Sequence, residues 1–186
     1  MSATTSFVSI CNRALTFLGA DPLTALTDDS KEGRSCNRIY EQSRDQALRD
    51  HPWNFAIKRA SLAASTTAPI YEYTNAFTWP TGCLRIIEVD TTEEWAVEGR
   101  SIVSDAAAPL KIVYLDTITD PTEFDAMFIE AYAYRIAADI SYDIIANQTV
   151  TTNLETLYAA KLAAARLVDA QESLSADENT WLEARA

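Results

Sequence analysis

The sequence predicts an α+β fold, mainly α, in which a small antiparallel β lobe is inserted between two pairs of helices. Apolar residues recur at three- and four-residue steps in four segments, two in each terminal part of the chain. Strand-like segments lie between them: "LRIIEVD", "EWAVEGRSIV" and "LKIVYLD". The chain has only four Gly and six Pro, which are too few turn residues for a large β-sandwich. The predicted order is therefore α-α-β-α-α.

The first pair of helices follows from two periodic segments near the N-terminus. In "TTSFVSICNRALTFLG" the following residues line one face: Phe7, Cys11, Ala14, Leu15 and Leu18. Thr5 or Ser6 can cap this helix, and Gly19 stands where a left-handed residue ends one. After a loop that includes Gly33, a second helix is expected over residues 35–50. It ends before a proline, because the residue preceding proline disfavours helical geometry.

The second pair of helices follows the strand-like segments. "DPTEFDAMFIEAYAYRIAADISYDII" predicts a long helix that Asp120 caps, with Pro121 at its first position. "TNLETLYAAKLAAARLVDAQESL" predicts another, with Thr152 as its cap.

We expect one domain over residues 1–186, because each helix pair has an apolar face to bury. Within it, the helical bundle comprises residues 1–60 and 118–172. The β lobe comprises residues 61–117, and residues 173–186 form a C-terminal tail.

The stretch "RDHPWNFAIKRASLA", residues 49–63, contains the chain's single histidine. Trp53, Phe55 and Ile57 alternate with smaller or polar residues, which predicts a strand directly after Pro52. No titratable residue stands near His51 at a spacing that indicates catalysis. The sequence therefore favours a capping or packing role for His51 at a corner between helix and strand, over an active site.

The composition argues against several classes of protein. The net charge is −12 and the pI about 4.4, whereas a dedicated nucleic-acid binder needs Lys and Arg to neutralise phosphates. The charge is uneven: residues 1–60 carry eight Lys/Arg against seven Asp/Glu, and residues 61–186 carry seven against twenty.

No apolar run is long enough to span a membrane. The N-terminal segment does not resemble a signal peptide, so synthesis in the cytoplasm is expected.

No catalytic, cofactor or metal site is predicted. The three cysteines, Cys11, Cys36 and Cys83, are widely spaced, which favours three reduced, mostly buried thiols over a zinc site. A nucleophilic cysteine would have one histidine to use as its base. The sequence contains neither of the two glycine-rich motifs that bind phosphates, G-x-x-x-x-G-K-[ST] and G-x-G-x-x-G. Acidic pairs such as Asp28-Asp29 and Glu93-Glu94 are typical of a solvated surface in so acidic a chain, and Asp28-Asp29 offers at most a weak Ca²⁺ contact.

Several motifs occur together in an order that resembles a known family. They are "CNRALTFLGADPLTALTDDS", "GRSCNRIYEQSRDQALRDHPWNFAIKRASLA" and "YTNAFTWPTGCLRIIEV". This string resembles tail tubular protein A, the head-to-tail adaptor of short-tailed bacteriophages, over residues 7–63 and 71–89. Trp79 and Thr81-Gly82 depart from the family's pattern, and the C-terminal helices match it only in length and character.

The resemblance implies a structural virion protein in the neck of the tail rather than an enzyme. Such adaptors form a dodecameric ring of identical copies between the portal protein and the tail nozzle protein, and DNA passes through the lumen without specific binding. The resemblance also makes Pro52, Trp53 and Phe55 an aromatic anchor that fixes the corner between bundle and β lobe. It implies neither a cofactor nor a membrane.

Two other functions remain open at this point. One is a small virion-associated hydrolase that uses paired carboxylates, which would need one carboxyl group with a raised pKa in a cleft. The other is an acidic helical chaperone or regulator that binds basic partners. In the tail, Trp181 and Leu182 are the large apolar residues, so they are candidates for docking on a partner or for packing on the chain's own helices.

Overall fold

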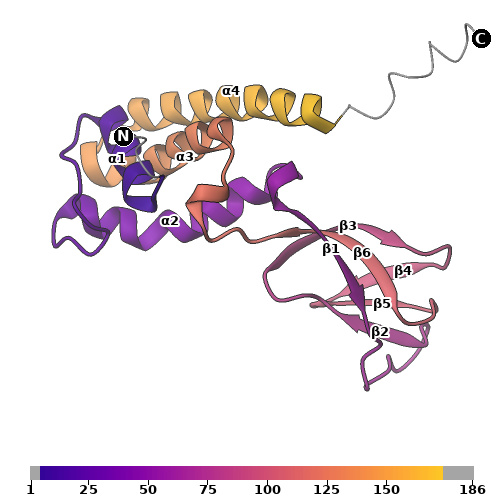
Figure 1. Ribbon diagram of the computed structural model, residues 1–186. Helices are drawn as coiled ribbons and strands as arrows, with labels where there is room; N and C mark the ends of the chain where they lie inside the picture. Colours follow the sequence, from indigo (N-terminus) through magenta and orange to yellow (C-terminus); the bar gives the residue numbers. More distant parts are fainter. Residues whose placement is uncertain (1–4, 174–186) are drawn as a thin grey trace, which may run out of the picture. The chain divides into compact units, whose positions relative to one another are not determined.

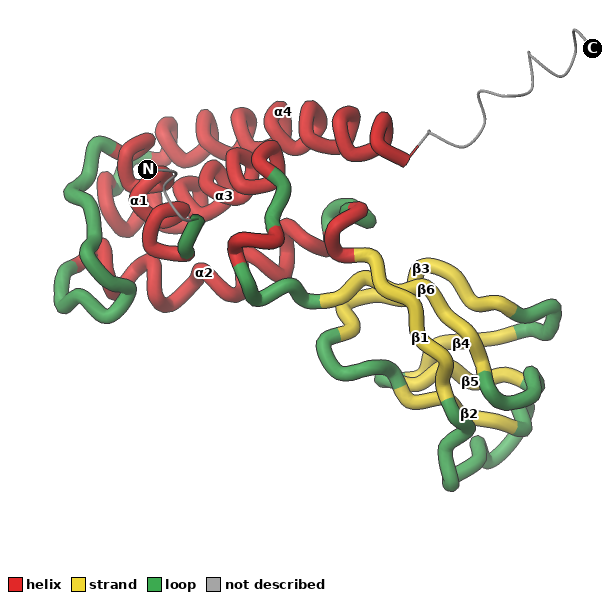
Figure 2. The backbone as a smooth tube through the Cα atoms, in the orientation of Figure 1, coloured by secondary structure: helices red, strands yellow, loops and turns green. Residues whose placement is uncertain are grey.

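The computed structural model describes residues 5–173 and divides the chain into two compact units. One unit runs up to Phe55 and resumes at Ile118, and the other is Ala56–Thr117. Within the described residues there are four α-helices, all in the first unit, and six strands, all in the second (Figures 1 and 2). The fold is therefore α+β and mainly α, in the order that the sequence predicts.

The helical unit is built around its third helix. Its helices are α1 (Phe7–Leu18), α2 (Lys31–Arg49), α3 (Ala126–Ile145) and α4 (Gln148–Ser173). Helix α3 packs against each of the other three and lies between α2 and α4 (Figure 1). It is apolar over a wide arc, with Phe128, Tyr132, Ile136 and Ile140 each no more than 1% exposed. A helix that packs against neighbours on several sides needs such an arc, because a single narrow apolar stripe could contact only one of them.

The interface between α2 and α3 is polar as well as apolar. Ser43 on α2 donates to Asp139 on α3 at 2.6 Å, and Arg135 pairs with the same carboxylate at 3.1 Å. Arg38 pairs with Asp143 one turn further along. Helix α2 therefore uses hydrogen bonds to fix its register against α3, since few large aliphatic side chains lie on its inner face.

Helix α1 starts after Ser6, one of its two predicted caps, but α2, α3 and α4 start elsewhere than predicted, because other side chains supply their caps. Helix α2 begins at Lys31, four residues before the predicted position, with Ser30 accepting from the Gly33 N–H at 2.9 Å. Asp120 caps only a short 3₁₀ turn, and Asp125 caps α3 by accepting from its first-turn N–H groups. Helix α4 begins at Gln148, where the preceding Asn147 accepts from Thr149 N at 3.0 Å.

The β unit consists of two three-stranded antiparallel sheets, with strand orders β1-β6-β3 and β2-β5-β4. The strands are β1 (Ile57–Leu62), β2 (Asn75–Thr78), β3 (Cys83–Asp90), β4 (Trp95–Glu98), β5 (Ser101–Ser104) and β6 (Leu110–Asp116). Inward-facing residues of both sheets share one core: Leu62, Phe77, Cys83, Val89, Ile102, Ala106, Leu110, Ile112 and Tyr114. The strand-like segments thus lie where the sequence places them, but they form two sheets instead of one.

The boundary of the β unit lies earlier than the sequence indicates. The β unit starts at Ala56 and strand β1 at Ile57, so residues 56–60 belong to the β unit and not to the bundle. The strand expected directly after Pro52 therefore starts later than predicted, because Asn54–Ala56 form a 3₁₀ turn before it. The reason is that the N–H groups of Trp53 and Asn54 are already bonded within the helical unit and are not available to a β ladder.

Gly33 provides a test of how the loop before α2 packs. A Cβ at this position would lie 2.3 Å from the backbone oxygen of Asp28. Gly33→Ala should therefore destabilise the protein by about 1–3 kcal/mol through overpacking, although alanine normally favours a helix over glycine by about 1 kcal/mol. Chemical denaturation measures the change. Asn37→Ala, at an exposed site on the same helix, is the control and should not destabilise; equal stability of both variants would contradict the close contact.

Candidate functional site

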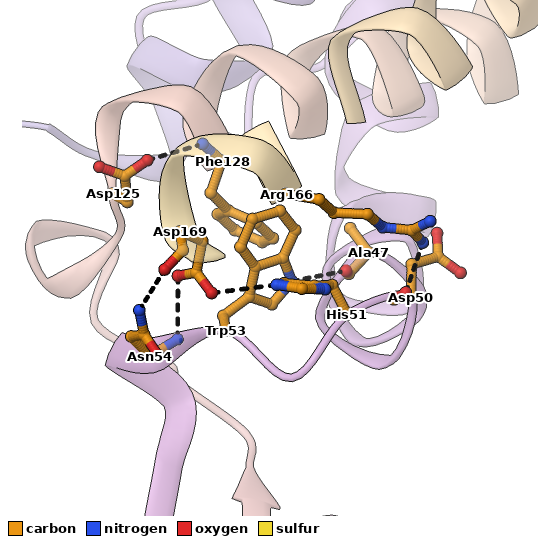
Figure 3. A network of polar contacts seen from close by, with 9 residues as sticks. All are labelled: Ala47, Asp50, His51, Trp53, Asn54, Asp125, Phe128, Arg166 and Asp169. Carbon is orange, nitrogen blue, oxygen red and sulfur yellow. Dashed lines mark hydrogen bonds and ion pairs between the residues drawn. The ribbon is translucent and has the colours of Figure 1, made fainter. Parts of the chain in front are cut away.

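The most distinctive polar and aromatic cluster in the helical unit surrounds the corner, residues 50–56. The chain turns sharply there because the Trp53 N–H donates to the His51 carbonyl at 3.0 Å. The turn directs the Trp53 ring into the bundle, where it is fully buried (Figure 3). Its Nε1 donates to the Ala47 carbonyl at 3.1 Å. A carbonyl in the last turn of α2, which has no partner within its helix, is thereby satisfied.

An aromatic cluster holds this ring in place. Phe128 of α3 meets Trp53 edge to face, with ring centroids 5.1 Å apart, and meets Phe55 at 5.2 Å. Phe124 packs on Phe128 at 5.0 Å. Pairs of this geometry contribute about 0.5–1.5 kcal/mol beyond the area they bury. Of the predicted anchor residues, Trp53 is therefore fully buried, whereas Phe55 and Pro52 are half-buried.

A single carboxylate from α4 meets the corner on its other side. The Asp169 carboxylate contacts His51 Nε2 through one oxygen and accepts from the Asn54 N–H through the other, both at 3.0 Å. The Asn54 side-chain amide donates in turn to the Asp169 carbonyl at 2.7 Å. Figure 3 shows the three residues converging from the corner and from α4. Because Asp169 is only 8% exposed, these bonds compensate for burying its charge.

Sequence reasoning did not find Asp169, because it looked for a titratable partner of His51 only among residues nearby in the chain. The two residues are 118 positions apart, so no local spacing connects them. The sequence of α4 nevertheless contains a signal that Asp169 has a partner inside the fold. The buried stripe of α4 consists of Leu154, Tyr158, Leu162 and Ala165. Asp169 continues this stripe at the next helical step, and an acid on a buried stripe indicates a partner inside the fold.

Asp50 ties α4 to the corner a second time. Its carboxylate accepts from the Tyr158 hydroxyl, and its backbone carbonyl accepts from the Arg166 guanidinium. Burial and the hydrogen bond to Asp50 raise the pKa of Tyr158 well above its ordinary value, so the hydroxyl stays protonated and donates. Two turns of α4 are thus bonded to the end of α2.

The cysteines lie away from this cluster. All three are buried and free, as predicted. Cys11 and Cys36 contact each other inside the bundle, where the hydrogen bond that Cys11 donates to Cys36, together with burial, raises the pKa of Cys11. Cys83 belongs to the core of the β unit. His51 contacts Asp169 and the Trp53 ring, and so acts here as a connection between α4 and the corner rather than as a partner of a thiol.

The acidic pairs noted in the sequence do not act together. Two backbone N–H groups of the preceding loop bond to Asp28 and lower its pKa, whereas Asp29 pairs with Arg34. Glu93 and Glu94 are both exposed on the β unit. Across residues 5–173, no three His, Cys, Asp or Glu side chains come together in a way that could hold a metal ion.

The predicted docking pair, Trp181 and Leu182, lies outside the described residues. No helix among those described is long and apolar enough to cross a membrane. Searches against models of known protein families and against curated proteins found no match to the chain.

The anchor hypothesis is tested by comparing two neighbouring residues. Trp53→Ala should cost ~3–5 kcal/mol of stability, because it removes a fully buried ring from a packed cluster. His51→Ala should cost only about 1 kcal/mol, because Asn54 still bonds to Asp169 after the imidazole is lost. Chemical denaturation of both variants measures the difference. Near-neutral results for both would remove the anchor hypothesis.

The Asp169 connection is tested on the same helix. Asp169→Ala leaves the Asn54 N–H and the His51 ring without their acceptor, so a loss of about 1.5–3 kcal/mol is expected. Glu172→Ala, at an exposed position one turn further on, is the matched control and should change stability by less than about 0.5 kcal/mol. Thermal and denaturant melts of both variants decide the matter, and similar losses would show that α4 is not held through Asp169.

Proposed function

We propose that this chain is a head-to-tail adaptor of a short-tailed bacteriophage, a structural protein that forms a ring between the portal and the tail nozzle. The observation that carries the proposal is the ordered string of motifs over residues 7–63 and 71–89. The arrangement of a helical bundle interrupted by a β unit agrees with it.

The motif residues support a shared architecture, because most of them have structural roles in this chain. Gly19 of "FLG" adopts a left-handed conformation at the end of α1. Asn12 of "CNRAL" accepts from the backbone N–H and donates to the carbonyl of Leu23 in the "DPL" loop. Trp53 of "PWNFA" is buried in the bundle. Because these motif residues stabilise the fold, they support a fold shared with the adaptor family. Contacts with partner proteins must instead come from residues on the exposed surface.

The charge is compatible with a conduit for DNA. At −12 per copy, a ring of identical chains would repel the phosphates that pass through it and so would not hold the genome back. The same charge makes free copies repel one another at low salt. We therefore infer that the portal protein acts as the template on which the ring assembles, and that the nozzle protein binds the ring afterwards. Its place would be the neck of the virion.

Assembly with the portal tests the proposal. The isolated protein should be a monomer or a weak oligomer by light scattering at low salt. Mixed with the portal protein of the same phage, it should add a ring of twelvefold symmetry that electron microscopy resolves. A portal from an unrelated phage is the control. If the cognate portal shows no added density at any protein ratio, the adaptor proposal is wrong; a stable ring without portal would contradict only the template step.

A further inference from the structure

The free edges of the two β-sheets differ in how well they are protected. The strand orders leave β1 and β3 at the edges of one sheet, and β2 and β4 at the edges of the other. An edge strand presents unpaired backbone N–H and C=O groups, and proteins usually protect such edges against pairing with other chains. The usual devices are Lys side chains, bulges and covering segments. The four edges can be compared on these terms.

Three of the edges carry such a device. Strand β1 carries two exposed basic residues, Lys58, which pairs with Asp116 of β6 at 2.6 Å, and Arg59. Strand β3 changes register twice along its pairing with β6, which twists its free edge. The free side of β2 is covered, because the Ala76 carbonyl accepts from the Ser65 N–H at 2.7 Å. Each device discourages pairing with another chain.

Strand β4, Trp95–Glu98, is four residues long, like β2, but it has neither a Lys side chain nor a bulge. It contains no Lys, Arg or Pro and pairs with β5 without any register shift. Trp95 and Val97, two residues apart and so on one face, are 42% and 46% exposed. The register places Val97 beside the buried Ile102, which in turn lies beside the buried Phe77. An apolar row thus runs from the core of the unit to its open edge.

The surroundings of this edge are acidic. Glu93, Glu94 and Glu98 are exposed within or just before the strand. Partial burial raises the pKa of Tyr73, and the charges of Glu72, Glu94, Asp105 and Glu98 raise it further. The charge therefore selects a positively charged partner.

We propose that β4 is a strand-addition site that takes an extended, basic segment of a partner protein, with apolar and Lys/Arg side chains in alternation. The partner's backbone would complete the edge, its apolar side chains would extend the row ending at Val97, and its basic side chains would face Glu94 and Glu98. Arg100, in the hairpin turn, directs its guanidinium to the Cys83 carbonyl, to which it donates at 3.0 Å. A second copy of this chain fits poorly, since antiparallel pairing of two β4 strands brings like charges together. The inference does not depend on the adaptor proposal.

The test uses a synthetic probe and the whole protein. A peptide of about eight alternating Val and Lys residues should shift the backbone amide NMR signals of β4 saturably. Val97→Lys, which adds an edge lysine, should weaken binding by about tenfold or more. Ile87→Lys, a matched change of an exposed aliphatic on the edge strand β3, should leave the affinity unchanged. Circular dichroism confirms that both variants are folded.

The remaining outcomes each overturn the proposal. The absence of a saturable shift in β4 would exclude strand addition there, and equal weakening by both lysine variants would show that binding is not located at β4. Equal affinity for a peptide of alternating Val and Glu would exclude the charge selection. A dimer in light scattering that Val97→Lys dissolves would make a second copy the occupant instead of a basic partner.

Discussion

The burial of the Trp53 ring is the interaction on which the organisation of the helical unit depends. It fills the space beside Phe128, and its indole nitrogen satisfies a carbonyl near the end of α2. The turn that inserts the ring also exposes the Asn54 N–H to Asp169, so packing and polar contacts reinforce each other at the same few residues. One local change of direction thereby connects the second, third and fourth helices of the bundle.

The sequence predicts those features that neighbouring residues determine. The bounds of α1 follow from a 3.6-residue period and from Ser6 and Gly19, whose roles depend on local backbone geometry alone. The turn between β4 and β5, inside the predicted strand-like segment "EWAVEGRSIV", likewise depends on local geometry, with Gly99 at positive φ. The burial of Trp53 agrees with its place in an aromatic stretch after a proline.

The features that the sequence does not predict depend on contacts between distant residues. Gly33 looks like a loop residue, yet it belongs to α2. A glycine is needed there because the carbonyl of Asp28 packs against it and leaves no room for a side chain. Asp169 has an acidic side chain that by composition belongs on the surface, but its partners come from the corner. The division into two sheets depends on β1 pairing with β6, more than forty residues away, and no short-range pattern encodes that choice.

These two kinds of feature bear differently on function. The recognisable motifs lie where the chain needs internal support, so their physical roles are already accounted for by packing, capping and loop closure. A partner cannot reach Trp53 without opening the bundle. Recognition must therefore use exposed groups, which are the groups that short motifs describe least well. In the β unit, strand β4 combines an open backbone edge, exposed apolar side chains and a defined charge, whereas each of the other three edges carries lysine, bulges or a covering segment. An open edge of this kind is where another chain can add a strand, which is why we assign the proposed contact to β4.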